Sequence, residues 1–186
     1  MSATNRGSKR KESDFYATPL DCIQNFLNNY DKEITGDVLE PSAGNGNISK
    51  ILKQNYNNIN LTSLELREEE KHNLDDISDE VIIGDFLQLD IDKKYDFIIG
   101  NPPYSFGIEF VKKSLNLLKD DGKLIFLLRT AFLESKSRYE FWQKYPLSEL
   151  YTLSKRPSFT GNGTDATSYS WFVWDKSTSK QKIKVI

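Results

Sequence analysis

The stretch Tyr95–Tyr104 reads YDFIIGNPPY, and its pattern predicts a buried strand that runs into a stiff loop. The apolar run Phe97–Ile99 predicts a short buried strand. Two prolines then end the strand, since proline fixes φ near about −65° and cannot donate a ladder hydrogen bond. The loop presents an amide, a carbonyl and a ring that together suit a planar molecule with an amino group. The Asn101 amide oxygen and the Pro102 carbonyl can accept from the NH2, and the Tyr104 ring can stack on the heterocycle.

A second stretch, Asp37–Ile48, reads DVLEPSAGNGNI and predicts a strand, a glycine turn and a helix over about 47–56. Glycines allow a tight turn and let a ligand approach the backbone closely. The turn has Gly44-x-Gly46, but it lacks the longer glycine fingerprint of dinucleotide sites and the Gly-Lys-Ser/Thr of phosphate loops. The sequence therefore disfavours dinucleotide or nucleoside triphosphate binding.

Strand and helix patterns alternate along most of the chain. Further strands are expected at 60–66, 80–86, 122–129, 150–154 and 168–174, and helices at 19–30, after the YDFIIGNPPY stretch, and at 132–145. This alternation predicts an α/β fold, a doubly wound and mostly parallel sheet of seven strands. Ligands in such folds bind at the carboxyl ends of the strands, and each motif named here falls at one of those ends.

Several polar residues follow predicted strands or begin a predicted helix. Glu65 ends the second strand, 21 residues after Gly44, where a carboxylate can accept both hydroxyls of a ribose. Asp85 and Phe86 close the third strand and could bind an adenine, although core packing explains Phe86 equally well. Thr18 is placed to cap the helix that Pro19 begins, and that role alone would also explain the pair.

Taken together, these motifs resemble those of the class I methyltransferases that use S-adenosylmethionine (SAM) to methylate N6 of adenine in DNA. The order Tyr-x-Thr-Pro, glycine loop, Asn-Pro-Pro-Tyr is similar to the gamma order in that family, and the resemblance covers about 15–174. It implies a Rossmann-like fold and SAM as cofactor. The implied catalytic residues are Asn101, Pro102, Pro103 and Tyr104. The implied cofactor contacts are Tyr16, Thr18, Pro19, Glu40, Ser42, Gly44, Gly46, Glu65, Leu66, Asp85, Phe86 and Asn101. Tyr104, Arg156 and Phe159 are expected to bind the substrate, and no metal is expected.

The expected activity is methyl transfer from SAM to the N6 amino group of adenine in DNA. Alternatives are an RNA adenine methyltransferase, a protein-glutamine methyltransferase, and an inactive SAM-binding or accessory module. Gamma-type enzymes usually add a separate target-recognition domain, and these 186 residues are not expected to hold one. Sequence specificity is therefore expected to be weak, to come from 130–168, or to need a protein partner.

Composition gives only broad limits. At 38% hydrophobic and 28% charged residues the chain is typical of globular proteins, and no apolar run reaches the roughly 18 residues of a membrane span. The single cysteine, Cys22, excludes an internal disulfide and favours a reducing compartment, so cytoplasm is the expected location. Such a small catalytic domain would suit a phage or a mobile element.

Charge is unevenly distributed along the chain. The net charge is −2, but 31–96 carries −9 and 155–186 carries +4, so the basic residues lie where phosphate contacts would need them. Solvated surface charge explains any one cluster as well. The expected division is a disordered polar tail at 1–14, a methyltransferase domain at 15–176 and a basic tail at 177–186.

Overall fold

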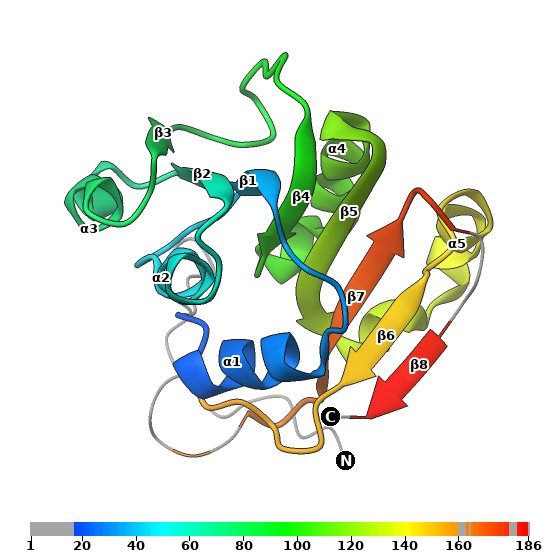
Figure 1. The fold of residues 1–186 in the computed structure, drawn as a ribbon. Helices are drawn as coiled ribbons and strands as arrows, with labels where there is room; N and C mark the ends of the chain where they lie inside the picture. The colour runs from blue at the N-terminus through cyan, green and yellow to red at the C-terminus, as the bar shows by residue number, and fades with distance from the viewer. Residues whose placement is uncertain (1–16, 160–162, 164, 179–181, 186) are drawn as a thin grey trace.

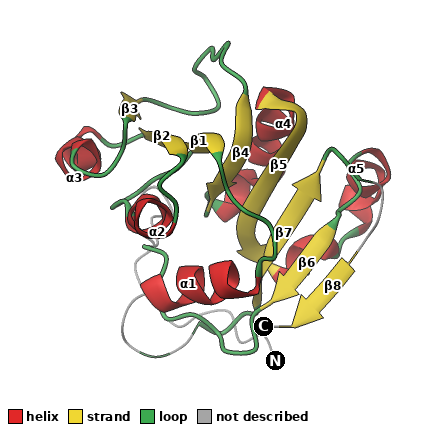
Figure 2. Cartoon of the chain, viewed as in Figure 1, coloured by secondary structure: helices red, strands yellow, loops and turns green. Residues whose placement is uncertain are grey.

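The computed structural model describes residues 17–159, 163, 165–178 and 182–185. The expected tail at 1–14 and the predicted SAM contact Tyr16 therefore lie outside the described residues. The described part forms one twisted sheet with helices on both of its faces (Figures 1 and 2).

The sheet has eight strands in the order β3-β2-β1-β4-β5-β7-β6-β8. Their bounds are β1 Gly36–Glu40, β2 Ile59–Glu65, β3 Glu80–Ile83, β4 Tyr95–Gly100, β5 Leu118–Arg129, β6 Glu149–Thr152, β7 Tyr169–Asp175 and β8 Lys182–Val185. Strands β1 to β5 run parallel, whereas β7 is antiparallel to both of its neighbours, β5 and β6. The prediction of a doubly wound, mostly parallel sheet is confirmed. The seven expected strands are joined at one edge by β8, which comes from the segment expected to be a basic tail and pairs in parallel with β6.

Helices α1 Leu20–Asn29 and α2 Asn47–Asn55 cover one face of the sheet, and α4 Gly107–Leu117 and α5 Tyr139–Lys144 cover the other (Figure 1). The short helix α3 Lys71–Asp75 lies between β2 and β3 in the chain. Side chains alternate between two cores, as the period of two along a strand requires. Phe97 and Ile99 of β4 enter the core under α1 and α2, whereas Ile98 between them enters the core under α4 and α5. Apolar runs are therefore continuous in the central strands, because both faces are buried.

The expected helix at 132–145 is wrong in its first half. The structure has two 3₁₀ turns there, Thr130–Leu133 and Lys136–Arg138, and only then α5. Ser135 separates the turns with φ 105°, which a helix cannot contain. One guanidinium nitrogen of Arg138 donates to the carbonyls of Ala131, Phe132 and Glu134, so a local side-chain contact satisfies backbone groups that a helix would have satisfied by itself.

The order of the strands places the functional edge of the sheet. After β1 the chain winds outward through β2 and β3, and then returns to the other side of β1 with β4 and β5. The winding direction reverses between β1 and β4. Sheets of this kind open a crevice at the carboxyl ends of the strands at that point.

Candidate active site

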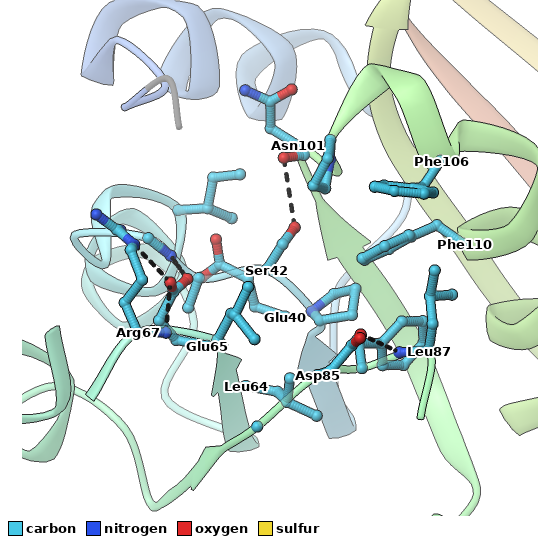
Figure 3. Close-up of a pocket in the computed structure, with 18 of the residues that line it drawn as sticks. Glu40, Ser42, Leu64, Glu65, Arg67, Asp85, Leu87, Asn101, Phe106 and Phe110 are labelled. Atoms are coloured by element: carbon cyan, nitrogen blue, oxygen red, sulfur yellow. Dashed lines mark hydrogen bonds and ion pairs between the residues drawn. The ribbon is translucent and has the colours of Figure 1, made fainter. Parts of the chain in front are cut away.

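A cavity of about 660 Å³ lies at the carboxyl ends of β1, β2 and β4 (Figure 3). Its volume falls in the usual range for sites that bind a cofactor or a drug-sized ligand. Among the predicted site residues, those that line it are Thr18, Glu40, Ser42, Gly44, Glu65, Leu66, Asp85, Phe86, Asn101 and Pro103. Residues as far apart in the sequence as Thr18 and Pro103 thus meet in one hollow. Those that follow β1 to β4 do so because parallel strands end at the same edge.

The glycine turn after β1 shapes one wall of the cavity. Gly44 has φ 58°, in the left-handed region that side chains disfavour, and its N–H donates to Glu65 Oε2 at 2.7 Å. Ser42 Oγ donates to the backbone carbonyl of Asn101 at 3.3 Å and so joins this turn to the loop after β4 (Figure 3). Gly46 is also left-handed, with φ 80°, but it does not line the cavity. A Cβ there would lie 3.0 Å from Leu74 on α3, so both the backbone conformation and the close packing favour glycine.

Glu65 is buried at the end of β2, where its carboxylate organises its surroundings. Besides Gly44, the backbone N–H of Arg67 (3.1 Å) and its Nε (2.8 Å) donate to Oε1. A carboxylate has about four lone-pair sites, so these three donors leave room for a hydroxyl on Oε2. Leu66, between the two, is 56% exposed and offers an apolar surface to the cavity.

Glu40, at the end of β1, is completely buried. Ser49 donates to Oε2 through both its backbone N–H (2.9 Å) and its hydroxyl (2.5 Å), and hydroxyl contacts of 2.6 Å continue from Ser49 to Ser63 and from Ser63 to Ser78. Burial raises the pKa of Glu40 to about 8, with a smaller contribution in the same direction from Glu65, and the Ser49 hydrogen bonds oppose the rise. A positively charged group in the cavity would therefore meet a carboxyl that it can ionise.

The turn after β3 forms another wall of the cavity. Asp85 Oδ1 accepts from the backbone N–H of Leu87 at 2.9 Å and holds the turn (Figure 3). Phe86 lines the cavity but is only 2% exposed, and its ring centroid lies 4.9 Å from that of Phe110 on α4. Phe86 is thus packed in the core and also lines the cavity, so the two predicted roles do not exclude each other.

Asn101 follows β4 directly, and its side chain is held in place. Its Nδ2 donates to Thr18 Oγ1 at 3.1 Å, and Asn47 Nδ2 donates to the Thr18 carbonyl at 2.8 Å. The prediction that Thr18 caps α1 is wrong: Pro19 occupies the N-cap position and no side chain caps that helix. The Thr18 hydroxyl instead accepts the hydrogen bond from the Asn101 side chain. Pro19 and Pro102 do not line the cavity, and Pro102 is buried.

The predicted substrate residues lie outside the cavity. The Tyr104 ring is packed against Tyr169, with centroids 5.5 Å apart, and the Arg129 guanidinium lies over it at 5.0 Å. Phe159 meets the other side of this cluster edge-on, 5.0 Å from the Tyr169 ring, whereas Arg156 is exposed. The structure thus brings Tyr104 and Phe159 together around Tyr169, beside the cavity rather than in it.

Several residues that line the cavity were not predicted from the sequence. They include Ala17, Asn47, Arg67, Ser105, Phe106 and Phe110. Phe110 lies on α4, and the four-residue spacing from Phe106 to Phe110 was the available indication that one face of this helix extends into the site. Arg67 gave no such indication, because its role depends on the bend after β2.

No cluster of three or more His, Cys, Asp or Glu side chains suited to a metal ion occurs among the described residues. In the same part of the chain, no helix is long and apolar enough to cross a membrane.

The sheet order and the crevice define a class I methyltransferase fold. The same fold occurs in lmo1582 of Listeria monocytogenes, assigned to the class I SAM-dependent methyltransferases, with a TM-score of 0.69, 13% identity, and coverage of 91% of this chain and 65% of that one. The model of the methyltransferase small domain matches residues 15–147, so the chain belongs to that family.

Curated relatives include the type II methyltransferase M.CvrRI of Paramecium bursaria Chlorella virus XZ-6E. It is 29% identical over 153 residues, which cover 70% of this chain and 40% of the relative. The ribosomal RNA small subunit methyltransferase C of Haemophilus influenzae (strain 86-028NP) is 29% identical over 116 residues, covering 59% and 35%. The chain thus spans well under half the length of these two relatives.

SAM is the cofactor of this chain, and the cavity fits it. Two buried carboxyls, Glu40 and Glu65, suit its cationic and hydroxyl groups. The apolar surfaces of Leu66 and Phe86 suit a planar heterocycle.

Proposed function

We propose that the chain transfers a methyl group from SAM to the N6 amino group of adenine in DNA. The observation that carries this proposal is that Asn101, at the start of Asn-Pro-Pro-Tyr, lines the same cavity as Gly44 and Glu65. A methyl donor held by the glycine turn and an amino group held by the Asn101 loop would therefore share one hollow. Ser42 Oγ, bonded to the Asn101 carbonyl, fixes the two loops relative to each other.

Bound SAM supplies a methyl group already activated on a sulfonium. The work left to the protein is to position an amino nitrogen in line with that methyl group, and positioning can account for much of a rate enhancement. The bond to Thr18 fixes how the Asn101 amide is turned. Its oxygen and the Pro102 carbonyl then serve as acceptors for N6–H, which favours a pyramidal nitrogen with an available lone pair. The nitrogen loses its proton after the transfer, so no titrating base is required.

In a duplex the adenine would have to leave the base stack to reach this loop. Stacking of the adenine on Tyr104 remains a prediction, and it requires the ring to give up part of its packing against Tyr169. Contacts by Arg156 and Phe159 likewise remain predictions.

DNA is the preferred substrate because M.CvrRI is a type II methyltransferase, the kind that modifies DNA. RNA is the second candidate, and the ribosomal RNA methyltransferase among the relatives favours it. A protein partner for target recognition, a cytoplasmic location and a phage or mobile-element origin stay predictions.

The test is methyl transfer from labelled SAM to duplex DNA, single-stranded DNA and structured RNA, followed by mass spectrometry of the nucleosides. We expect N6-methyladenine in DNA with the wild type and none with Asn101→Ala. Label confined to RNA would mean that the substrate is RNA, with the same catalytic site. SAM binding without any transfer would contradict the proposed activity in favour of an accessory module.

A further inference from the structure

Arg129 is a cation at the functional edge of the sheet that the cofactor site does not use. It is the last residue of β5, pairs with Tyr169 in β7, and is exposed. It does not line the cavity. Its guanidinium nevertheless lies 5.0 Å from the centroid of the Tyr104 ring, three residues after Asn101. A fixed positive charge thus lies immediately beside the loop proposed to receive the substrate.

The side chain is held in place without being neutralised by an ion pair. It stacks on Tyr104 and hydrogen-bonds Tyr169, whose hydroxyl in turn donates to Asp165 Oδ2 at 2.9 Å. Among the described residues no carboxylate comes within 4.0 Å of the Arg129 guanidinium. Partial burial opposes the charge, but the contacts with Tyr169, Tyr104 and Asp165 outweigh it and raise the pKa of Arg129, so the group stays charged.

This arrangement suits a phosphate. A guanidinium carries five N–H donors in its own plane, and stacking on a ring occupies its face while leaving the edge accessible. That edge matches two phosphate oxygens. Because the stacking and the hydrogen bond already fix the side chain, less conformational entropy is lost when the phosphate binds.

We propose that Arg129 binds a backbone phosphate of the nucleic-acid substrate next to the target nucleotide. Its stacking on Tyr104 then determines where that phosphate lies relative to Asn101. The inference rests on the proposed function, because it requires a nucleic acid as substrate.

The experiment measures binding of a fluorescent duplex and of a single strand between 50 and 300 mM salt. The proteins are the wild type, Arg129→Gln, Arg129→Lys and the control Lys94→Gln. Lys94 is exposed just before β4, at the opposite edge of the sheet, and bonds the carbonyl of Asn116. For Arg129→Gln we expect binding about tenfold weaker at low salt. Its plot of log K against log salt should be shallower by about 0.9 for duplex or 0.7 for single strand.

Arg129→Lys should restore the wild-type salt slope but not all of the affinity, since lysine keeps the charge and loses the planar guanidinium that can bond two phosphate oxygens. SAM affinity and melting temperature should stay at wild-type values in both variants. A wild-type slope in Arg129→Gln, or the same loss of slope in Lys94→Gln, would overturn the inference and leave the proposed function standing. If the wild type binds neither polymer, the proposed substrate fails and the inference fails with it.

Discussion

The hydroxyl of Thr18 accepts a hydrogen bond from Asn101 Nδ2 at 3.1 Å, across 83 positions of sequence. This contact joins the segment before α1 to the proposed catalytic loop. It gives Thr18 a tertiary role in place of the local cap that the sequence suggested. Since Thr18 is only 4% exposed, water cannot easily replace it as the partner.

Thr18→Val should lower the rate of methyl transfer about tenfold, because the variant has the same shape but no acceptor for the Asn101 amide. Thr18→Ser is the matched control and should retain most of the activity. Single-turnover kinetics with saturating SAM measures the effect. If Thr18→Val loses SAM affinity in proportion to rate, Thr18 serves the cofactor rather than Asn101.

Glu65→Gln should weaken SAM binding by about tenfold or more, since the new NH2 faces either the Gly44 N–H or Arg67 instead of accepting from both. Calorimetric titration with SAM measures the change. The control is Glu69→Gln, an exposed acid in the next turn of the chain. Equal affinities in the two variants would mean that the ribose contact lies elsewhere.

The stability of the protein should depend on pH through Glu40. Its pKa is 4.5 in a model compound and about 8 in the folded chain, so the folded state binds this proton more tightly than the unfolded state. The resulting stabilisation is fully present below pH 4.5 and is lost as the pH rises through 8. Glu40→Gln cannot ionise and should gain stability relative to the wild type across that window. Thermal unfolding at a series of pH values tests this, and a difference that does not change with pH would contradict it.

Gly46→Ala should destabilise the fold by about 2–4 kcal/mol, from left-handed strain plus overpacking. Its Cβ would lie 3.0 Å from Leu74 and 3.1 Å from Ile77. Gly163 provides the control, because it is also left-handed, at φ 92°, but a Cβ there meets no atom of the described residues within 4 Å. Gly163→Ala should therefore cost only about 1 kcal/mol of strain. Denaturant midpoints compare the two, and equal losses would show that packing against α3 adds nothing.

The amino-acid pattern was sufficient to predict the sheet and the edge that carries the site. The continuous apolar run Phe97–Ile99 predicted a strand, and the structure buries that strand on both faces. The alternation with helices makes the strand ends coincide. Glu65, Asp85 and Asn101 follow predicted strands and were therefore expected at one edge of the sheet, whereas Glu40 and Gly44 were expected there from the family resemblance. All five line the cavity. These assignments depend on local chain direction, which short motifs encode.

The contacts of individual side chains could be identified only from the tertiary structure. Thr18 looked like a cap and bonds Asn101 instead; Tyr104 looked free to stack and lies between Arg129 and Tyr169. The break of the expected helix at Ser135 is likewise maintained by the Arg138 guanidinium. The contacts of Thr18 and Tyr104 join residues whose separation in the sequence carries no periodic pattern. Their energies depend on distances of a few ångströms that exist only after the sheet has formed.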